Sequence, residues 1–221
     1  MGVLLMLMTI GGVIAALVLL AISAVTKKTW LARFTLGGVA VWVVFYAAML
    51  LGFSLTSKEK VLGLGEPKEY CGFYLDCHIH TTVTGVRTAK QIGGITSQGT
   101  FFIVNTKVFS DAKNPGINLH LLEPKAEVTD AKGRSYTRNT DAESLLPTAS
   151  VRLDQDIKSS QIIEKEIVFD VPATSGDLKL LITEGYGIDK YIEAVLIGDE
   201  DSLFHKRNYF NLEPVGANAK N

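Results

Sequence analysis

The residues best suited to chemistry gather in one short stretch, CGFYLDCHIH, at positions 71–80. It contains both cysteines of the chain and two of its four histidines. Two cysteines this close predict a disulfide if the domain lies in an oxidising compartment. Six residues of extended strand span about 20 Å, whereas the Cα atoms of a disulfide lie about 4.4–6.8 Å apart. A Cys71–Cys77 bridge therefore requires the chain to turn, and two separate thiols are the alternative.

The two histidines of this stretch have the spacing of a metal-binding pair. His78 and His80 are two residues apart, so on a β-strand both rings lie on the same face, together with Asp76. Imidazole nitrogens and a carboxylate oxygen are ordinary zinc ligands. The pattern predicts a candidate metal or small-ligand site formed by Asp76, His78 and His80. The alternative is the solvated face of a half-buried strand.

Catalytic motifs are absent from the sequence. It contains no nucleophile elbow, zinc-protease helix or phosphate-binding loop. Cys77 and His78 are not expected to act as nucleophile and base, because neighbouring strand residues point to opposite faces. Covalent haem needs Cys-x-x-Cys-His, but five residues separate the cysteines. We therefore expect a protein without catalytic activity and without a cofactor.

The charge distribution divides the chain into two unlike parts. No Asp or Glu precedes Glu59, and the only charged side chains in the first 57 residues are Lys27, Lys28 and Arg33. The remainder holds all 23 acidic side chains and is mildly acidic. A nucleic-acid binder would show a basic domain or stripe, so nucleic acid is not an expected partner.

The uncharged part contains two apolar runs, residues 3–26 and 34–56, within an expected membrane region of residues 1–57. Each exceeds the roughly 20 residues that a helix needs to cross a bilayer. Helices are expected because hydrocarbon offers the backbone no other hydrogen-bond partners. The lipid bilayer is thus an expected partner. For the first run, a cleaved signal peptide ending near Ala21-Ile22-Ser23 is the alternative, although a basic leader is missing.

Basic residues set the expected orientation. Lys27, Lys28 and Arg33 lie in the short loop between the helices, and such loops face the cytoplasm when they carry Lys and Arg. This places both termini on the outer side. Neither helix contains an ionisable residue, so an ion or proton path inside them is not expected.

Small residues recur four positions apart in both helices, a spacing that permits close approach of helix backbones. This seam either packs the two helices on each other or binds another membrane protein. The candidate seam consists of Gly11, Gly12, Ala15, Ala16, Ala48 and Gly52.

The charged part predicts a linker at residues 58–69, a β-domain at 70–203 and a tail at 204–221. Short β-prone runs separated by turn residues are typical of an antiparallel sandwich or barrel. Asp130–Gly133 predicts a hairpin turn with Gly133 in the left-handed region. The expected strands are residues 74–86, 100–110, 117–122, 126–129, 135–138, 162–171, 178–184 and 191–197.

Four segments resemble a known family: GTFFIVN from Gly99, VTDAKGRSY from Val128, VFDVP from Val168 and LKLLI from Leu178. The family consists of bacterial extracytoplasmic domains of uncharacterised function, related to the secreted mycobacterial immunoprotective antigen. The resemblance implies a telokin-like, immunoglobulin-like sandwich outside the cytoplasm, and it supplies no catalytic residues. Two spanning segments depart from the commoner lipoprotein or single-anchor arrangement.

The sequence therefore predicts an N-terminal two-helix transmembrane hairpin followed by an all-β, immunoglobulin-like antiparallel sandwich. The expected location is the bacterial inner membrane, with the C-terminal domain in the periplasm or extracellular space. The expected function is a non-catalytic interaction or scaffold module, such as an accessory subunit of a larger membrane complex. It would bind other membrane proteins through the hairpin and the sandwich. A ligand- or metal-binding sensor domain is the alternative.

Overall fold

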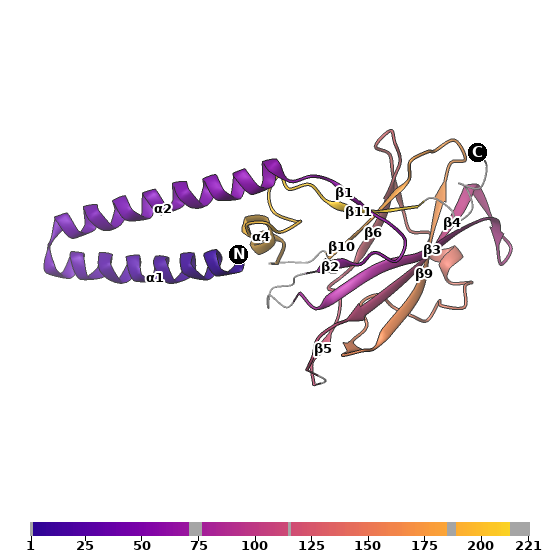
Figure 1. The fold of residues 1–221 in the computed structure, drawn as a ribbon, viewed down its shortest axis with the longest axis horizontal. Coiled ribbons are helices and arrows are strands. Elements are labelled where there is room, and N and C mark those ends of the chain that lie inside the picture. The colour runs from indigo at the N-terminus through magenta and orange to yellow at the C-terminus, as the bar shows by residue number, and fades with distance from the viewer. Residues whose placement is uncertain (1, 71–76, 115, 185–188, 213–221) are drawn as a thin grey trace. The chain divides into compact units, whose positions relative to one another are not determined.

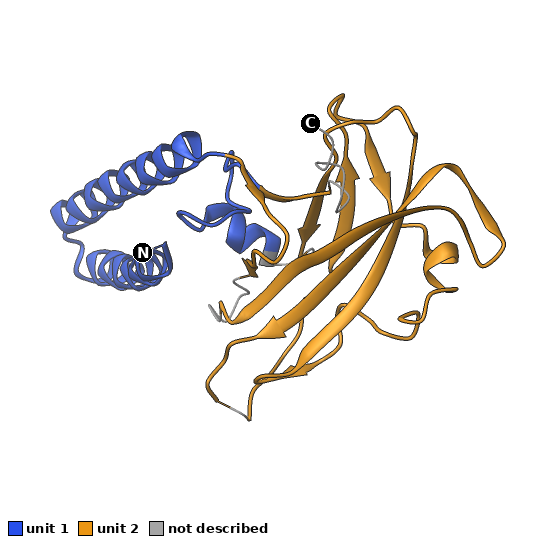
Figure 2. Cartoon of the chain, turned by 45° about the vertical axis from the view of Figure 1, so that its right-hand side comes forward, with its two compact units in different colours: residues 1–58, 188–207 blue, residues 59–187, 208–221 orange. Residues whose placement is uncertain are grey.

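The computed structural model describes residues 2–70, 77–114, 116–184 and 189–212. These residues form two compact units (Figure 2). The first, the helical unit, contains residues 1–58 and 188–207. The second, the sandwich unit, contains residues 59–187 and 208–221.

The helical unit is built on an antiparallel hairpin of α1 (Gly2–Thr26) and α2 (Thr29–Thr56) (Figure 1). Lys27, with φ of 54°, turns the chain in the left-handed region, and the Lys28 N–H donates to the Ser23 carbonyl oxygen over 3.1 Å. Only these two lysines separate the helices, so α2 begins earlier than the expected residue 34. The Trp42 indole donates to the Thr9 hydroxyl over 3.0 Å and joins the two helices.

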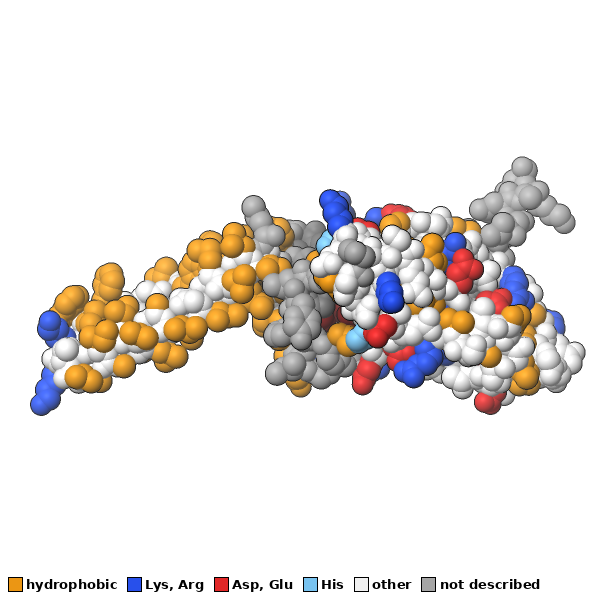
Figure 3. Space-filling view, turned by 90° about the horizontal axis from the view of Figure 1, so that it is seen from below, with side chains coloured by type: hydrophobic (Ala, Val, Ile, Leu, Met, Phe, Trp, Pro, Cys, Tyr) orange, Lys and Arg blue, Asp and Glu red, His pale blue; other side chains and the backbone are white. Residues whose placement is uncertain are grey.

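Apolar side chains cover the outside of this hairpin (Figure 3). Val25 is 84% exposed and Phe34 is 77% exposed, whereas a helix in a soluble core buries such residues. Both helices are long and apolar enough to cross a membrane. Lys and Arg side chains gather at the turn of the hairpin (Figure 3).

The sandwich unit consists of two larger sheets and a small two-stranded one. Neighbouring strands are antiparallel, except that β1 and β11 pair in parallel. The five-stranded sheet has the order β1 (Lys60–Leu62), β11 (Asn208–Asn211), β10 (Lys179–Thr183), β6 (Lys125–Thr129) and β7 (Ser135–Thr137). The four-stranded sheet has the order β2 (Lys68–Tyr70), β3 (Ile79–Ile92), β4 (Ile95–Ser110) and β9 (Ile162–Val171). The small sheet pairs β5 (Asn118–Leu119) with β8 (Ile157–Lys158).

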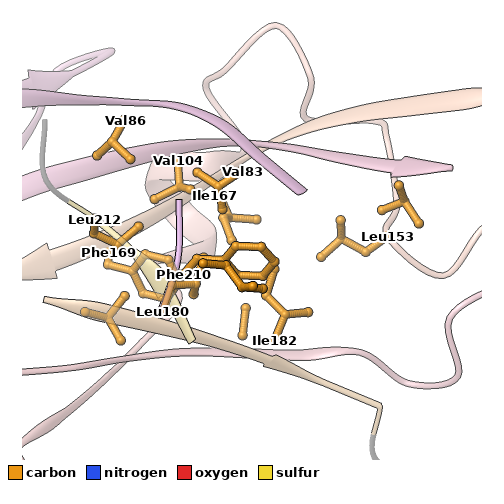
Figure 4. Packing of buried hydrophobic residues seen from close by; sticks show 14 of the residues in the cluster. Val83, Val86, Val104, Leu153, Ile167, Phe169, Leu180, Ile182, Phe210 and Leu212 are labelled. Atoms are coloured by element: carbon orange, nitrogen blue, oxygen red, sulfur yellow. The ribbon is translucent and has the colours of Figure 1, made fainter. Parts of the chain in front are cut away.

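The two larger sheets enclose one apolar core (Figure 4). Alternate residues of β9 and β10 belong to it, as the period-two hydrophobic patterns predict: Ile163, Ile167, Phe169 and Val171 of β9, and Leu180 and Ile182 of β10. The prediction of an antiparallel β-sandwich after two apolar helices is therefore confirmed. Labelled core residues are Val83, Val86, Val104, Leu153, Ile167, Phe169, Leu180, Ile182, Phe210 and Leu212.

The turn between β6 and β7 has the expected form. Gly133 has a φ of 74°, in the left-handed region. Asp130 fixes the loop, because its Oδ1 accepts the N–H of Lys132 at 2.9 Å and the N–H of Arg134 at 3.0 Å. A short helix, α3 (Thr140–Glu143), follows β7.

The secondary structure of three segments differs from the expectation. Residues 191–197 were expected as a strand, but they lie in α4 (Asp189–Val195) and the turns after it. Ile192 and Leu196 have helical spacing, and packing overrides the weak β-preference of such a run. The expected linker contains β1 and β2, and the expected tail contains β11. Pairing of Val61 with Tyr209 joins distant positions, so no local pattern could indicate it.

Candidate functional site

The predicted histidine pair lies where β3 begins, beside the end of β4. The register pairs His80 with Phe109, which brings Asp111, just after β4, next to both histidines. His78 Nδ1 lies 2.7 Å from Asp111 Oδ1, in hydrogen-bond contact. His80 Nε2 lies 3.3 Å from the same oxygen but forms no hydrogen bond with the described residues. Both imidazoles thus converge on one carboxylate oxygen.

The surroundings of Asp111 stabilise its charged form. The hydrogen bond with His78 lowers the pKa of Asp111, and His80 adds to this effect against an opposing contribution from lost hydration. The His80 ring also stacks on Phe109, with ring centroids 5.2 Å apart. His78 and Asp111 are both about half exposed, so the cluster is open to solvent.

Of the other candidate residues in this stretch, only Cys77 is among the described residues. Cys77 is disulfide-bonded, whereas Cys71 lies outside the described residues, so the Cys71–Cys77 pairing stays a prediction. Asp76 also lies outside them, so its place near His78 and His80 stays a prediction. Within the described part of the chain, no three His, Cys, Asp or Glu side chains form a group that could hold a metal ion.

Sequence reasoning missed Asp111, although it is the carboxylate that contacts both histidines. It lies 33 positions from His78, and only the pairing of β3 with β4 brings them together. The long apolar alternation of both strands could have suggested a hairpin, but its register depends on bulges near Gly85 and Gln91.

A second cluster of charged side chains lies at the edge of the four-stranded sheet, along β9. Glu143 is 4% exposed, and its Oε1 accepts the Arg138 Nε–H at 2.9 Å. Lys165 is 5% exposed and points to the core side of β9. Its Nζ donates to the carbonyl oxygen of Thr148 at 3.0 Å. Burial lowers the pKa of Lys165, an effect that the Glu143 carboxylate opposes.

This cluster borders an open pocket of about 510 Å³. The guanidinium groups of the pocket are already neutralised, since Arg138 pairs with Glu143 and Arg152 pairs with Asp154 at 2.8 Å. Lys165 is held by main-chain carbonyls of the loop after α3. The arrangement fixes that loop over the edge of β9, so we read the buried charges as structural.

The small residues of the hairpin leave open backbone surface. A Cβ added at Gly11, Gly12 or Gly52 would meet no atom within 4 Å. These three glycines are therefore not where α1 and α2 approach each other. Ala15 and Ala48 are exposed as well, while Ala16 is half-buried.

A feature that the sequence did not indicate is the attachment of residues 189–207 to the helices. The Tyr46 hydroxyl donates to the Val195 carbonyl oxygen over 2.7 Å. The hydroxyls of Ser54 and Ser202 lie 3.2 Å apart, and both residues are buried. Gly2 is needed at the start of α1, since a Cβ there would lie 2.1 Å from the carbonyl oxygen of Ile197.

No family model matches the chain, and no curated protein matches it. Among solved structures, it is similar to the secreted protein MPT63 from Mycobacterium tuberculosis, with 13% identity and a TM-score of 0.42, covering 61% of this chain and 95% of that one. It is also similar to an uncharacterized β-sandwich protein from Clostridium difficile, with 10% identity, a TM-score of 0.39, and coverage of 71% and 96%. A conserved hypothetical protein from Bacillus anthracis shows 16% identity, a TM-score of 0.39, and coverage of 54% and 94%. Similarity at this level carries no information about function.

Proposed function

We propose that this protein is a two-pass bacterial inner-membrane protein that presents its β-sandwich on the outer side as a non-catalytic interaction or scaffold module. One observation carries the proposal: the hairpin exposes apolar side chains along its length, and its charges are confined to the turn and the first two turns of α2. Water disfavours such a surface, whereas lipid matches it. Lys27, Lys28 and Arg33 at the turn favour a cytoplasmic loop.

The proposed partner is another integral membrane protein, bound partly through the hairpin. Open backbone at Gly11, Gly12 and Gly52 supports this, because close approach of a partner helix needs small residues that the protein's own packing does not use. The sandwich adds edge strands on which a partner could dock by strand addition. An accessory subunit that braces a larger complex would combine both contacts.

Mild-detergent purification of the tagged chain from native membranes tests this role. A recurrent partner should co-purify, and Gly11→Leu/Gly12→Leu should reduce its recovery. Gly37→Leu is the matched control, because Gly37 is equally open but lies outside the seam. Repeated recovery of the wild-type chain as a monomer without a partner would contradict the scaffold proposal.

The absence of catalysis is part of the same proposal. The sequence lacks motifs for nucleophilic, zinc or phosphate chemistry. In the β9 pocket, the buried carboxylate of Glu143 is committed to Arg138 and to the Val168 N–H. The Glu143 carboxylate is therefore not available to bind or activate a substrate.

A second candidate function is metal or ligand sensing on the outer face. Imidazole nitrogens and carboxylate oxygens are ordinary donors to first-row metal ions, and His78 Nδ1 and His80 Nε2 lie 2.7 and 3.3 Å from one oxygen of Asp111. These three side chains do not form a metal-binding group as they stand, so this candidate depends on Asp76, the further ligand that the sequence predicts. Metal content of the purified protein should fall in His78→Ala/His80→Ala if this candidate holds. His120→Ala is the control, because His120 forms a comparable pair with Asp156 at 3.0 Å. Equal metal content in all three proteins would remove the sensor proposal.

A further inference from the structure

Residues 189–207 are held to the last turns of α2 by several polar contacts. Tyr46 contacts Val195, Ser54 contacts Ser202, and the Lys206 N–H donates to the Ser57 hydroxyl over 2.8 Å. The α2 residues in these contacts, Tyr46 and Ser54, are about 12 Å apart along the helix axis, and Ser57 directly follows the helix. The segment is thus fixed along the end of α2 and is not a free tail.

This attachment limits how far the bilayer can extend along α2. After α4 the chain runs through turns from Leu196 to His205, and irregular backbone exposed to lipid is not tolerated in hydrocarbon. The part of α2 that bears this segment therefore lies outside the hydrocarbon core. Residues 29–45 remain and supply about 26 Å of helix, close to the roughly 30 Å of a bilayer core. Arg33 lies about 6 Å from the start of α2, so its long side chain has to extend to the cytoplasmic interface.

The segment itself presents apolar side chains to its surroundings. Tyr191 is 76% exposed and Phe204 is 68% exposed. Leu203 and Val195 add exposed aliphatic surface. Aromatic rings are enriched at the level of lipid headgroups, where the ring is half in an apolar medium and half in water.

The backbone conformation of Phe204 is also unusual. Its φ is 65°, in the left-handed region that residues with bulky side chains rarely adopt. The strained backbone holds an exposed phenyl ring. Strain of this kind persists only where the surrounding structure imposes it, and strained positions cluster at functional sites.

Charge argues for an apolar rather than an electrostatic contact. The segment carries three basic residues, Lys190, Lys206 and Arg207. Its acidic residues outnumber them: Asp189, Glu193, Asp199, Glu200 and Asp201. Anionic headgroups would therefore not attract it, and its contact with the membrane depends on the exposed rings.

From these observations we infer that residues 189–207 form an interfacial anchor, which lies in the boundary between headgroups and acyl chains with Tyr191 and Phe204 inserted. The hydrocarbon core then ends near Tyr46. The inference rests on the proposed function, because it requires that α1 and α2, which this segment contacts, span the membrane. It fixes the depth of the hairpin and the orientation of the helical unit at the membrane surface.

Depth-dependent fluorescence quenching tests the inference on the full chain in phosphatidylcholine nanodiscs. The chain has two tryptophans, Trp30 and Trp42, and both are replaced by Phe to create a silent background. Phe204→Trp or Tyr191→Trp then supplies one reporter, which conserves an aromatic ring at that position. A second protein, Trp30→Phe, retains Trp42 as the reporter inside the hairpin. Lipids carry bromine either near the headgroup end or near the methyl end of the acyl chain.

The Phe204→Trp reporter should be quenched about twofold more by bromine near the headgroups than by bromine near the chain ends. Trp42, which lies about 6 Å inside the boundary at Tyr46, should be quenched by bromine at both depths. Replacing part of the lipid by phosphatidylglycerol should leave the Phe204→Trp signal unchanged. A Phe204→Trp reporter that neither bromine quenches, while Trp42 is quenched, would overturn the anchor and leave the hairpin proposal standing.

Two other outcomes are also decisive. Stronger quenching of Phe204→Trp by bromine near the chain ends would place the segment in hydrocarbon and overturn the inference. If neither Trp42 nor Phe204→Trp is quenched, the hairpin does not span the bilayer, and the proposed function fails with the anchor.

Discussion

The carboxylate of Glu143 accepts the main-chain N–H of Val168 at 3.1 Å, across the edge of the four-stranded sheet. An open strand edge is a template for pairing with another chain, so proteins cover such edges. Here the loop around α3 covers β9, because the Asn139 N–H donates to the Val168 carbonyl oxygen over 2.7 Å and the Glu166 N–H donates to the Thr148 hydroxyl over 3.0 Å. The buried charges near the pocket thus protect this edge of the sheet.

Removing this carboxylate should be costly. Glu143→Ala leaves Arg138 without its partner and the Val168 N–H unsatisfied, which we expect to lower the free energy of unfolding by about 3–5 kcal/mol. Urea unfolding in detergent, monitored by the far-ultraviolet circular dichroism of the β-sheet, measures the change in the free energy of unfolding. Glu164→Ala is the control on β9, the strand that Glu143 contacts, since Glu164 forms an exposed pair with Lys107 and should cost less than about 1 kcal/mol. Equal losses in both variants would contradict the role given to Glu143.

The pKa of Asp111 should depend on His78. His78→Ala removes the main hydrogen bond that lowers this pKa, so the pKa should move up toward its ordinary value. Because the folded-state pKa is the lower one, the stabilising effect of the charged carboxylate is present above the unfolded-state pKa. It is lost as pH falls through the folded-state pKa. Carbon-13 titration of the carboxyl group measures the shift, and an unchanged pKa in His78→Ala would refute the contact.

The pH dependence of stability expected from Asp199 has the opposite sign to that expected from Asp111. Burial, together with the charges of Asp201 and Glu200, raises the pKa of Asp199 to about 6 against the lowering effect of a hydrogen bond from the Asp201 N–H. The folded state therefore holds a proton that the unfolded state loses, so stability should decrease as pH rises from about 4 to about 6. Asp199→Asn should abolish this dependence and stabilise the helical unit by up to about 2 kcal/mol at neutral pH. Thermal unfolding in detergent at acidic and neutral pH provides the measurement; Asp156→Asn, an exposed control, should leave the dependence intact.

The disulfide of Cys77 should close within the chain, to Cys71. The intact mass under non-reducing conditions should then be that of a monomer lacking two hydrogen atoms, and reductant should restore them. A loop of 15 residues contributes about 3 kcal/mol, so this shorter loop should contribute less, and Cys77→Ser should weaken the domain without unfolding it. A dimer linked by Cys77, or a chain whose mass does not respond to reductant, would exclude the predicted pairing.

The elements that sequence could predict are those with a local signal. The two uncharged apolar runs, each long enough to cross a bilayer, predict α1 and α2. Along residues 162–171, buried side chains recur at every second position, and this alternation predicts β9. Asp111 and residues 189–207 could not be found in this way. Asp111 reaches His78 only through the register of a bulged hairpin, and Val195 reaches Tyr46 across 149 positions. Contacts of that kind are determined by packing, which no local pattern encodes.

Membrane topology tests the central claim most directly. Alkaline phosphatase, which is active only outside the cytoplasm, is fused after Asn221 in one protein and between Lys27 and Lys28 in another, and both are expressed in a bacterial host. We predict high phosphatase activity for the Asn221 fusion and low activity for the fusion at the hairpin turn, with both proteins resisting extraction from membranes by alkaline carbonate. High activity at the turn with low activity at Asn221, or release of the intact chain by carbonate, would contradict a two-pass anchor with an external β-sandwich.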